Sequence, residues 1–469
     1  MLARWLKLHH TLGLLSCVGL LLWGLSGVMH PVMSRLQPRP AALLAPSPSI
    51  LLHEAKALPE VLKQHRLEEA SVHRIGLAQI NSQAYYRIAI QDQQPARYFS
   101  MQDGAELHNG DALHAHALAR HFTGKKEARI VSTEWVSEFN HEYLEINRLL
   151  PVWRVRFEGD DGLRAFVDTD QARLSALVNN TKQTLSEWFR VAHTWQFLDS
   201  YPKVRGIAMS LLLGLGFFSA ASGLYFYWRM RKTARQRLAK KRLARWHRTV
   251  GLVVALTTLL FTSSGMFHLW TQIQHEQPPR VAPNRALSAA QISPASWQTM
   301  LSNLNAQPVK QLHWLALPNN EWVWLLNLAT PPYAALTINA NTGEPYPEGV
   351  LGLAKGLATG WSGLPPHQIR AAEHVTKFTS EYGFINKRLP VVRVAFDAPN
   401  TPRYYIEVST ASLATQVTEM DALEGVSFAY LHKWHFIGNK EVRDGLLALF
   451  ALLNVLVALC GLVLFCRKH

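Results

Sequence analysis

Long apolar runs alternate with polar stretches along this chain. Four runs, over residues 11–31, 205–228, 249–270 and 444–466, have no Asp, Glu, Lys or Arg in their apolar cores. Roughly 20 helical residues at a rise of about 1.5 Å each cross a bilayer core of about 30 Å. The mean hydropathy of the whole chain is only −0.02, so its apolar residues are concentrated in these runs. The pattern therefore predicts four transmembrane helices.

The polar stretches show a different period, in which apolar and polar residues alternate. Residues 153–157 and 164–168, on either side of a turn at 159–162, predict a β-hairpin, and residues 391–396 with 403–408 predict another. Two further hairpins are expected over 85–90 with 97–101 and over 322–328 with 333–338, and a helical stretch over 50–65. The polar stretches thus predict two α+β domains with antiparallel sheets, over 32–200 and 271–440.

The chain also repeats itself. Residues 9–13 (HHTLG) and 26–30 (SGVMH) recur 238 positions later as 247–251 (HRTVG) and 264–268 (SGMFH). Residues 147–157 (NRLLPVWRVRF) recur at an offset of 239 as 386–396 (NKRLPVVRVAF), and a His-x-Trp motif precedes both the second and the fourth run. Two copies of a unit of helix, polar domain and helix, related by a pseudo-twofold axis along the membrane normal, explain this pattern.

Charge predicts the orientation of the helices. The link 229–248 holds ten Lys or Arg and no acidic residue, and both termini are basic. By the positive-inside rule, the termini and the link face the cytoplasm and the two polar domains face outward. The net charge of +15 therefore indicates topology rather than nucleic-acid binding. The boundaries expected are 1–31, 32–200, 201–228, 229–248, 249–270, 271–440 and 441–469.

Histidines mark both ends of the first and third helices. His9 and His30 are 21 residues apart, as are His247 and His268, so each pair lies on nearly one side of its helix. Ionisable residues in a membrane are functional by default, and neutral imidazole is a suitable axial ligand of haem iron. The chain has no CxxCH motif, and its three cysteines lie in or beside the membrane helices, so haem b is expected, about two per chain.

The pairing of these ligands stays open. His9 with His247 and His30 with His268 is one arrangement. His193 and His432, in amphipathic stretches before the second and fourth helices, are further candidate ligands, each with His30 or His268. His10 and His435 rank lower because they have no repeat partner. Glycines such as Gly13, Gly223 and Gly251 permit close approach of backbones or of a porphyrin. Histidines of the first polar domain (His108, His114, His116 and His121) are either solvated or in contact with substrate.

The motifs resemble those of the PepSY-associated transmembrane proteins, iron-regulated proteins of the bacterial inner membrane. The resemblance implies four membrane helices in two duplicated pairs and two periplasmic PepSY-like α+β domains. It also implies an oxidoreductase that carries electrons across the membrane to a ferric siderophore or another ferric chelate, with release of ferrous iron. The chain has no dinucleotide or flavin fingerprint, so the electron donor is expected to be a quinol or a cytoplasmic reductase.

Two other functions fit the same pattern less well. A periplasmic binding or regulatory protein would need the polar domains but no haem. A small transporter would use the paired repeats, but the helices lack charged residues in their apolar cores and four helices leave little room for a substrate path.

Overall fold

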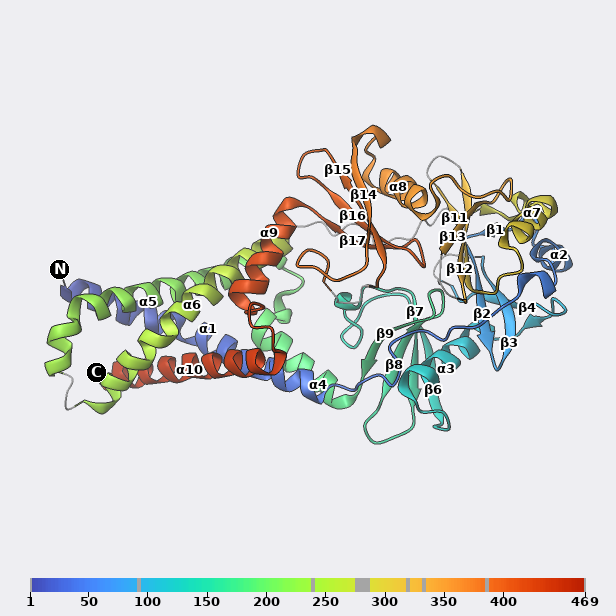
Figure 1. Ribbon diagram of the computed structural model, residues 1–469. Coiled ribbons are helices and arrows are strands. Elements are labelled where there is room, and N and C mark those ends of the chain that lie inside the picture. Colours follow the sequence, from blue (N-terminus) through green and yellow to red (C-terminus); the bar gives the residue numbers. More distant parts are fainter. Residues whose placement is uncertain are drawn as a thin grey trace. The chain divides into compact units, whose positions relative to one another are not determined.

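The structure is a computed structural model of the chain (Figure 1). It describes residues 2–90, 94–237, 241–274, 287–317, 321–330, 335–383 and 388–467. Contacts divide the chain into two compact units. One, here the helical unit, combines Met1–Gln37, Thr181–Glu276 and Met420–His469, and the other, the sheet unit, combines Pro38–Asn180 and Gln277–Glu419.

Four helices of the helical unit are long and apolar enough to cross a membrane. They are α1 (Leu2–Leu36), α5 (Pro202–Arg237), α6 (Arg242–Gln274) and α10 (Lys440–Cys466). Each predicted run lies inside one of them, so the four predicted helices are confirmed. α1 and α6 each pack against both α5 and α10, which places α1 and α6 diagonally in the bundle.

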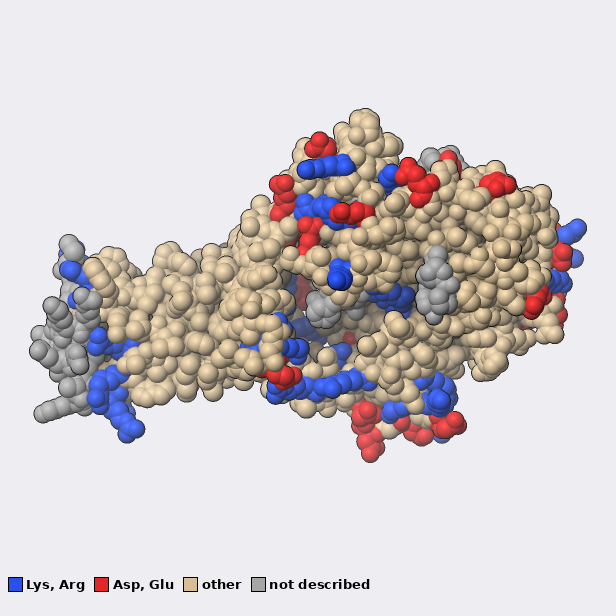
Figure 2. Space-filling view, viewed as in Figure 1, with Lys and Arg blue, Asp and Glu red and all other residues tan. Residues whose placement is uncertain are grey.

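The two ends of this bundle differ in charge. Both termini lie at the end where α5 leads into α6, here called the terminal end (Figure 1). Arg4, Lys7, Arg242 and Arg245 are exposed there, and Figure 2 shows Lys and Arg gathered at this end. The opposite, distal end carries short elements that precede α5 and α10. These are α4 (Asn180–Phe189), η3 (Arg190–Thr194), η4 (Gln196–Leu198), α9 (Glu419–Ser427) and η7 (Phe428–His432).

The sheet unit contains five antiparallel sheets in its described residues. Residues 38–180 form β2-β3-β4-β5 (Arg74–Ile80, Gln83–Ala89, Arg97–Ser100, Glu106–Leu107) and β6-β7-β8-β9 (Ile130–Val136, Val152–Phe157, Arg164–Asp168, Arg173–Val178). Residues 277–419 form β11-β12-β13 (Val309–Ala316, Trp322–Leu328, Ala335–Asn339) and β14-β15-β16-β17 (Ile369–Val375, Val391–Phe396, Arg403–Glu407, Leu413–Val417). β1 (Ser71–Val72) pairs with β10 (Leu287–Ser288).

Helices cover these sheets. The longer ones are α2 (Leu58–Gln64), α3 (Gly110–Thr123), α7 (Pro294–Leu304) and α8 (Gly349–Ser362), and single turns are η1 (Leu52–Glu54), η2 (Glu145–Asn147), η5 (Ala289–Gln291) and η6 (Pro366–Gln368). Local signals explain their limits: Ser293 caps α7 by accepting from the Ser296 backbone N–H, and α3 ends at Gly124, whose φ is +71°.

Four predicted hairpins are present as β3–β4, β7–β8, β12–β13 and β15–β16. Residues 333 and 334 of the third, and 386 and 387 of the repeated motif, lie outside the described residues. The largest core draws on both polar stretches, because Tyr86 and Phe99 pack with Trp297 and Trp324. Burial of such aromatic side chains is a dominant source of stability, so the two stretches support each other.

Candidate functional site

His9 of α1 and His247 of α6, here the proximal pair, approach each other near the terminal end of the bundle. Their ring centroids are 6.5 Å apart and their planes are inclined by 55°. A metal ion lies about 2 Å from an imidazole nitrogen, and that nitrogen lies about 1 Å from its ring centroid, so two imidazoles on one metal have centroids roughly 6 Å apart. The observed separation therefore suits two axial ligands of one haem iron.

The second nitrogen of each ring is held by a neighbouring helix. Nδ1 of His9 lies 3.1 Å from the backbone oxygen of Ser219 and 2.9 Å from Oγ of Ser222, both on α5. Nδ1 of His247 lies 3.1 Å from the backbone oxygen of Val457 on α10. A carbonyl oxygen only accepts, so each Nδ1 donates and Nε2 keeps its lone pair for a metal. Ser219 and Val457 are 238 positions apart, as are the two histidines.

A glycine lies against each of these rings. A Cβ atom built on Gly223 would lie 3.2 Å from Cε1 of His9, and one built on Gly461 would lie 3.2 Å from Cε1 of His247. Such contacts are tighter than ordinary van der Waals distances, so a side chain at either position would press on the imidazole. The two glycines let α5 and α10 approach the rings, and they too are 238 positions apart.

At the distal end, His193 and His432 each lie in a single π-helical turn, η3 and η7. Nδ1 of His193 is 2.9 Å from Oγ of Ser26, and Nδ1 of His432 is 3.1 Å from Oγ of Ser264. Each serine hydroxyl donates to a carbonyl one turn back in its own helix, so it accepts from the imidazole and again leaves Nε2 free. Isolated π-turns are frequent at functional sites, and these two bring their histidines back onto α1 and α6.

The tryptophan that follows each π-turn has an unusual backbone. Trp195 and Trp434 have φ values of 55° and 51°, in the left-handed region that bulky residues rarely adopt. Trp195 stacks on Trp23 with centroids 6.0 Å apart, and Trp434 stacks on Phe261 at 5.7 Å. Strained residues persist where the surroundings hold them, and here the stacking secures the turn that carries each histidine.

Phenylalanines pack against the distal histidines. Phe428 stacks on His268 and on His432, with centroid distances of 4.2 and 4.7 Å. Phe189 contacts His30 at 5.9 Å and stacks on His193 at 4.6 Å. Each phenylalanine thus packs against both distal histidines of its own repeat. The contacts leave open which two of the four imidazoles share a metal.

His268 also has a partner that His30 lacks. Nδ1 of His268 lies 2.5 Å from Oε1 of Glu424 on α9. At an offset of 239, the first repeat has Leu185 at the position of Glu424. His30 is exposed, and Lys433 is its strongest charged neighbour. We define His30, His193, His268 and His432 as the distal cluster.

Burial keeps the distal imidazoles outside the membrane spans neutral. Desolvation, with a smaller contribution from His30 and His268, lowers the pKa of His193 to about 4. Desolvation and the neighbouring His193 and His268 lower the pKa of His432 to about 3. Neutral imidazole is the form that binds a metal, so burial favours ligation at these positions.

The remaining candidate histidines lie apart from these pairs. His10 is half-buried beside His9, and His435 is exposed. In the sheet unit, Nε2 of His116 lies 2.7 Å from Oγ1 of Thr133, and Nε2 of His121 lies 2.9 Å from the Leu44 backbone oxygen. Among the described residues, no three His, Cys, Asp or Glu side chains form a metal-binding group.

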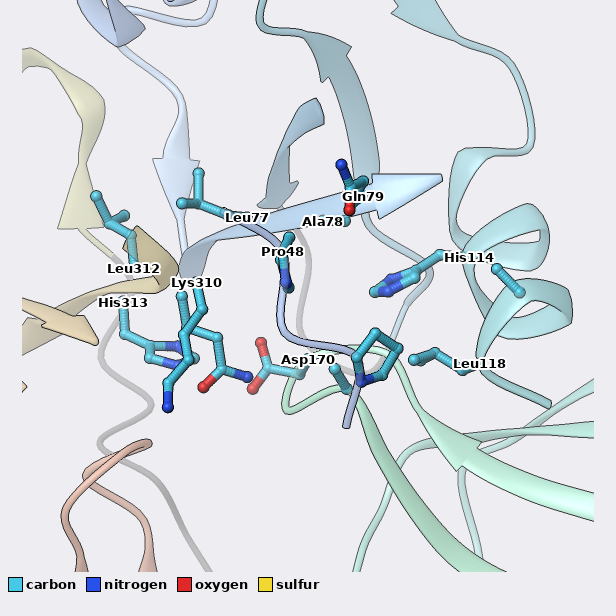
Figure 3. A pocket seen from close by; sticks show the side chains of 14 residues that line it. Pro48, Leu77, Ala78, Gln79, His114, Leu118, Asp170, Lys310, Leu312 and His313 are labelled. Atoms are coloured by element: carbon cyan, nitrogen blue, oxygen red, sulfur yellow. The ribbon is translucent and has the colours of Figure 1, made fainter. Parts of the chain in front are cut away.

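His114 belongs to a buried polar network of the sheet unit. Its Nδ1 lies 2.9 Å from the Tyr98 hydroxyl, which donates to Asp111 at 2.8 Å. Desolvation lowers the pKa of His114 to about 4. The ring lines a cavity of about 60 Å³, and Figure 3 shows His114 on one side, Lys310 and His313 on the other, and Asp170 between them. Residues 170, 310 and 313 were not expected from the sequence to share a site.

Comparison with known proteins places the chain in a family. A model described as the PepSY-associated TM region matches residues 77–468. The chain belongs to this PepSY-associated family. It is a multi-pass membrane protein with sheet domains, which confirms the family resemblance noted in the sequence. No curated protein matches the chain.

Some residues of the site escaped sequence reasoning. Gly461 repeats Gly223 at an offset of 238, and the SG pair of each SGxxH motif contains Ser26 or Ser264. The repeat therefore contained a signal for both. The acceptor carbonyls of Ser219 and Val457 had no signal, because a backbone group has no residue identity. In this member of the PepSY-associated family, the packing of α5 against α1 and of α10 against α6 places those carbonyls beside the histidines.

Proposed function

We propose that the chain holds haem b in its helical bundle and carries electrons across the membrane to a ferric chelate. The observation that carries this proposal is the proximal pair, His9 and His247, at a centroid distance of 6.5 Å with both Nδ1 atoms held by carbonyl oxygens. These contacts leave two Nε2 lone pairs in the bundle interior. Haem, when bound, supplies one-electron oxidation and reduction.

Six histidines are the proposed ligands. His9 and His247 hold the proximal haem, and the distal cluster holds the second. Within that cluster, the two serine-held rings of His193 and His432 are the preferred pair, because matched hydroxyl contacts orient both rings alike. His30 and His268 remain as alternative partners. Two haems per chain follow from this arrangement.

The protein's own residues have three tasks in this function. The carbonyls of Ser219 and Val457 and the hydroxyls of Ser26 and Ser264 orient the imidazoles and fix their tautomers. Gly223 and Gly461 leave space beside the proximal rings. The long apolar helices exclude water, so electron transfer between two fixed positions does not need acid or base groups.

The proposed topology follows from charge and repetition. The terminal end, with Arg4, Lys7, Arg242 and Arg245, faces the cytoplasm of a bacterial inner membrane, and the sheet unit lies in the periplasm. Two duplicated helix pairs related by a pseudo-twofold axis account for the matched contacts at offsets of 238 and 239. The proximal pair then lies near the cytoplasm and the distal cluster near the periplasm.

The reaction is a one-electron reduction. A quinol or a separate cytoplasmic reductase gives up one electron per ferric ion, and the ferric chelate becomes ferrous. Siderophores bind iron with hard oxygen donors, which hold ferrous iron less strongly than ferric iron, so the metal is released. The substrate is a ferric siderophore or a similar periplasmic ferric chelate.

Stopped-flow spectroscopy tests this function. The purified protein is reduced with dithionite, freed of excess reductant and mixed anaerobically with ferric citrate, while haem absorbance and chelator-trapped ferrous iron are recorded. Reoxidation of the haem with formation of an equal amount of ferrous iron is expected, and His247→Ala, which lacks the proximal haem, is expected to form about half as much ferrous iron per chain. The exposed His435→Ala is the matched control. A protein that binds haem but is not reoxidised by ferric chelates would contradict the proposal.

A further inference from the structure

The cavity of the sheet unit has a buried polar floor and an exposed rim. His313 of β11 is 6% exposed and His114 of α3 is 4% exposed. Gln79 and Pro46, which also line the cavity, are exposed. A volume of about 60 Å³ has room for a few water-sized atoms, which is the size of a carboxylate group. The cavity therefore borders both exposed residues and the buried ring of His313.

His313 has an unused polar atom on this floor. Its Nε2 is buried and has no hydrogen-bond partner among the described residues of the chain. Desolvation lowers the pKa of the ring to about 4, so the imidazole is neutral at physiological pH. A buried nitrogen without a partner costs free energy, and a ligand that supplies the partner recovers it. The position of the ring indicates where that ligand binds.

The charges around His313 are mostly positive. The groups that act on it most strongly are Asp170 and the three guanidinium groups of Arg74, Arg87 and Arg388. Asp170 pairs with Arg74 and accepts from Nη1 of Arg87 at 2.7 Å, and Arg87 also lies 3.5 Å from Asp111, so these charges largely offset one another. Lys310, two strand positions before Leu312, adds a cation to the lining. The surroundings of His313 therefore favour an anion over a cation.

Arg388 is a cation of this region that makes no direct ion pair among the described residues. No carboxylate of those residues lies within 4 Å of its guanidinium group, whereas Arg173 pairs with Glu407 at 3.0 Å. Desolvation and the nearby Arg173 lower the pKa of Arg388 to about 10, against the opposing effect of Glu407 and Asp168. The first repeat has Leu149 at the matching position, so the repeat itself does not require a charge here. A half-buried cation of this kind suits an anionic ligand.

From this arrangement we propose that the cavity beside His313 binds a carboxylate of an anionic, oxygen-ligated ferric chelate. The carboxylate accepts from Lys310 and from Nε2–H of His313, so the neutral ring carries its proton on Nε2, and Arg388 adds long-range attraction. The identity of the ligand as the electron acceptor rests on the function proposed above. The site itself does not depend on haem, so the two can be tested separately.

Equilibrium dialysis of the full-length protein in detergent tests the site. The probe is gallium(III) citrate, which resembles ferric citrate but is not reduced, and haem is counted on the same samples. Saturable binding is expected, with about tenfold weaker affinity in His313→Leu and in Arg388→Gln and weaker affinity at higher salt. Arg388→Lys keeps the charge and should restore most of the affinity. Arg370→Gln, at an exposed arginine of β14, is the matched control.

Each outcome of this experiment has a separate meaning. Absent or non-saturable binding by the wild type, or equal loss of affinity in Arg370→Gln, would overturn the proposed site. Equal affinity for metal-free citrate would overturn the chelate as ligand. A protein without haem that still binds gallium citrate in a manner dependent on His313 would support the site and contradict the haem function. Circular dichroism of each variant excludes loss of fold as the cause.

Discussion

The proximal pair and the distal cluster of the helical unit are built to different degrees of symmetry. At the proximal pair, the main contacts have counterparts: His9 and His247 each donate Nδ1 to a carbonyl oxygen, and each faces a glycine. His9 also contacts the neutral hydroxyl of Ser222, whose matching position in the second repeat is Cys460. The distal cluster repeats the contacts of Ser26 and Ser264 and the phenylalanine stacks on His193 and His432. The Glu424 carboxylate contacts His268 in the second repeat alone.

Matched contacts suit the binding of a cofactor, whereas an unmatched charged contact suits the approach of an electron donor or acceptor. Two equivalent imidazoles suit a flat cofactor with two equivalent faces, so matched contacts at both rings are expected where that cofactor binds. A donor or acceptor that approaches one end of the bundle has no such symmetry. The unmatched Glu424 therefore points to the distal end as the place where the two repeats have different tasks.

Removal of a proximal histidine should have the largest effect. His9→Ala or His247→Ala takes away one of two axial ligands, and about half of the haem should be lost from a chain that holds two. Pyridine haemochrome analysis of the purified variants measures this loss. His435→Ala should retain the full amount. Unchanged haem content in both proximal variants would contradict the assignment of His9 and His247 as haem ligands.

Filling the space beside a proximal ring should have the next largest effect. Gly223→Val or Gly461→Val places branched carbons where a Cβ alone would lie 3.2 Å from the imidazole, so the ring is displaced. Proximal haem should fall severalfold, measured as the reduced haem absorbance per protein. Gly214→Val is the matched control, because a Cβ at that position of α5 meets no atom within 4 Å. Equal haem loss in Gly214→Val would indicate a general packing defect.

Loss of a distal serine should have an intermediate effect. Ser26→Ala or Ser264→Ala removes the acceptor that holds Nδ1 of the distal histidine. Partners of this kind typically change metal affinity by about 10–100-fold. Titration of the haem-free protein with haem measures the affinity. Ser263→Ala, whose hydroxyl bonds only to carbonyls of its own helix, should behave as the wild type. Identical affinities in all three variants would contradict the assigned role.

The smallest effect is expected at the asymmetric contact. Glu424→Gln keeps a hydrogen-bond acceptor at His268 but removes the charge that makes the imidazole more basic. If His268 is an axial ligand, the midpoint potential of one haem should rise by tens of millivolts, where about 59 mV equals a tenfold change for one electron. Redox titration monitored by absorbance measures it. A potential that does not move would favour His193 with His432 as the distal pair.

The sequence predicted the membrane helices better than their ends. The apolar runs mark only the part that a bilayer requires, whereas α1 continues past Pro31 to Leu36 and α6 begins at Arg242. Polar and basic residues prolong a helix without adding hydropathy, so the predicted segments were shorter than the helices. Hairpins were found because the alternation of apolar and polar residues is a local signal, to which the glycines of the turn 159–162 add in one of the four.

The candidate site was only partly visible in the sequence. The repeat identified all six histidines, because a residue with a chemical role and a constant offset can be seen in the chain itself. The fold-back of η3 and η7 onto Ser26 and Ser264 and the carbonyl partners of the proximal rings are tertiary contacts. The cavity at His313 is a further example, because it combines β2, α3 and β11, which are far apart in the chain.

The most direct test of the central claim is a reduced-minus-oxidised visible spectrum of the purified full-length protein, with haem counted by the pyridine haemochrome assay. The account predicts sharp b-type bands of six-coordinate haem and about two haems per chain after expression with ample haem supply. A colourless protein under the same conditions would contradict it, because the matched rings of His9 and His247 would then have no cofactor to hold.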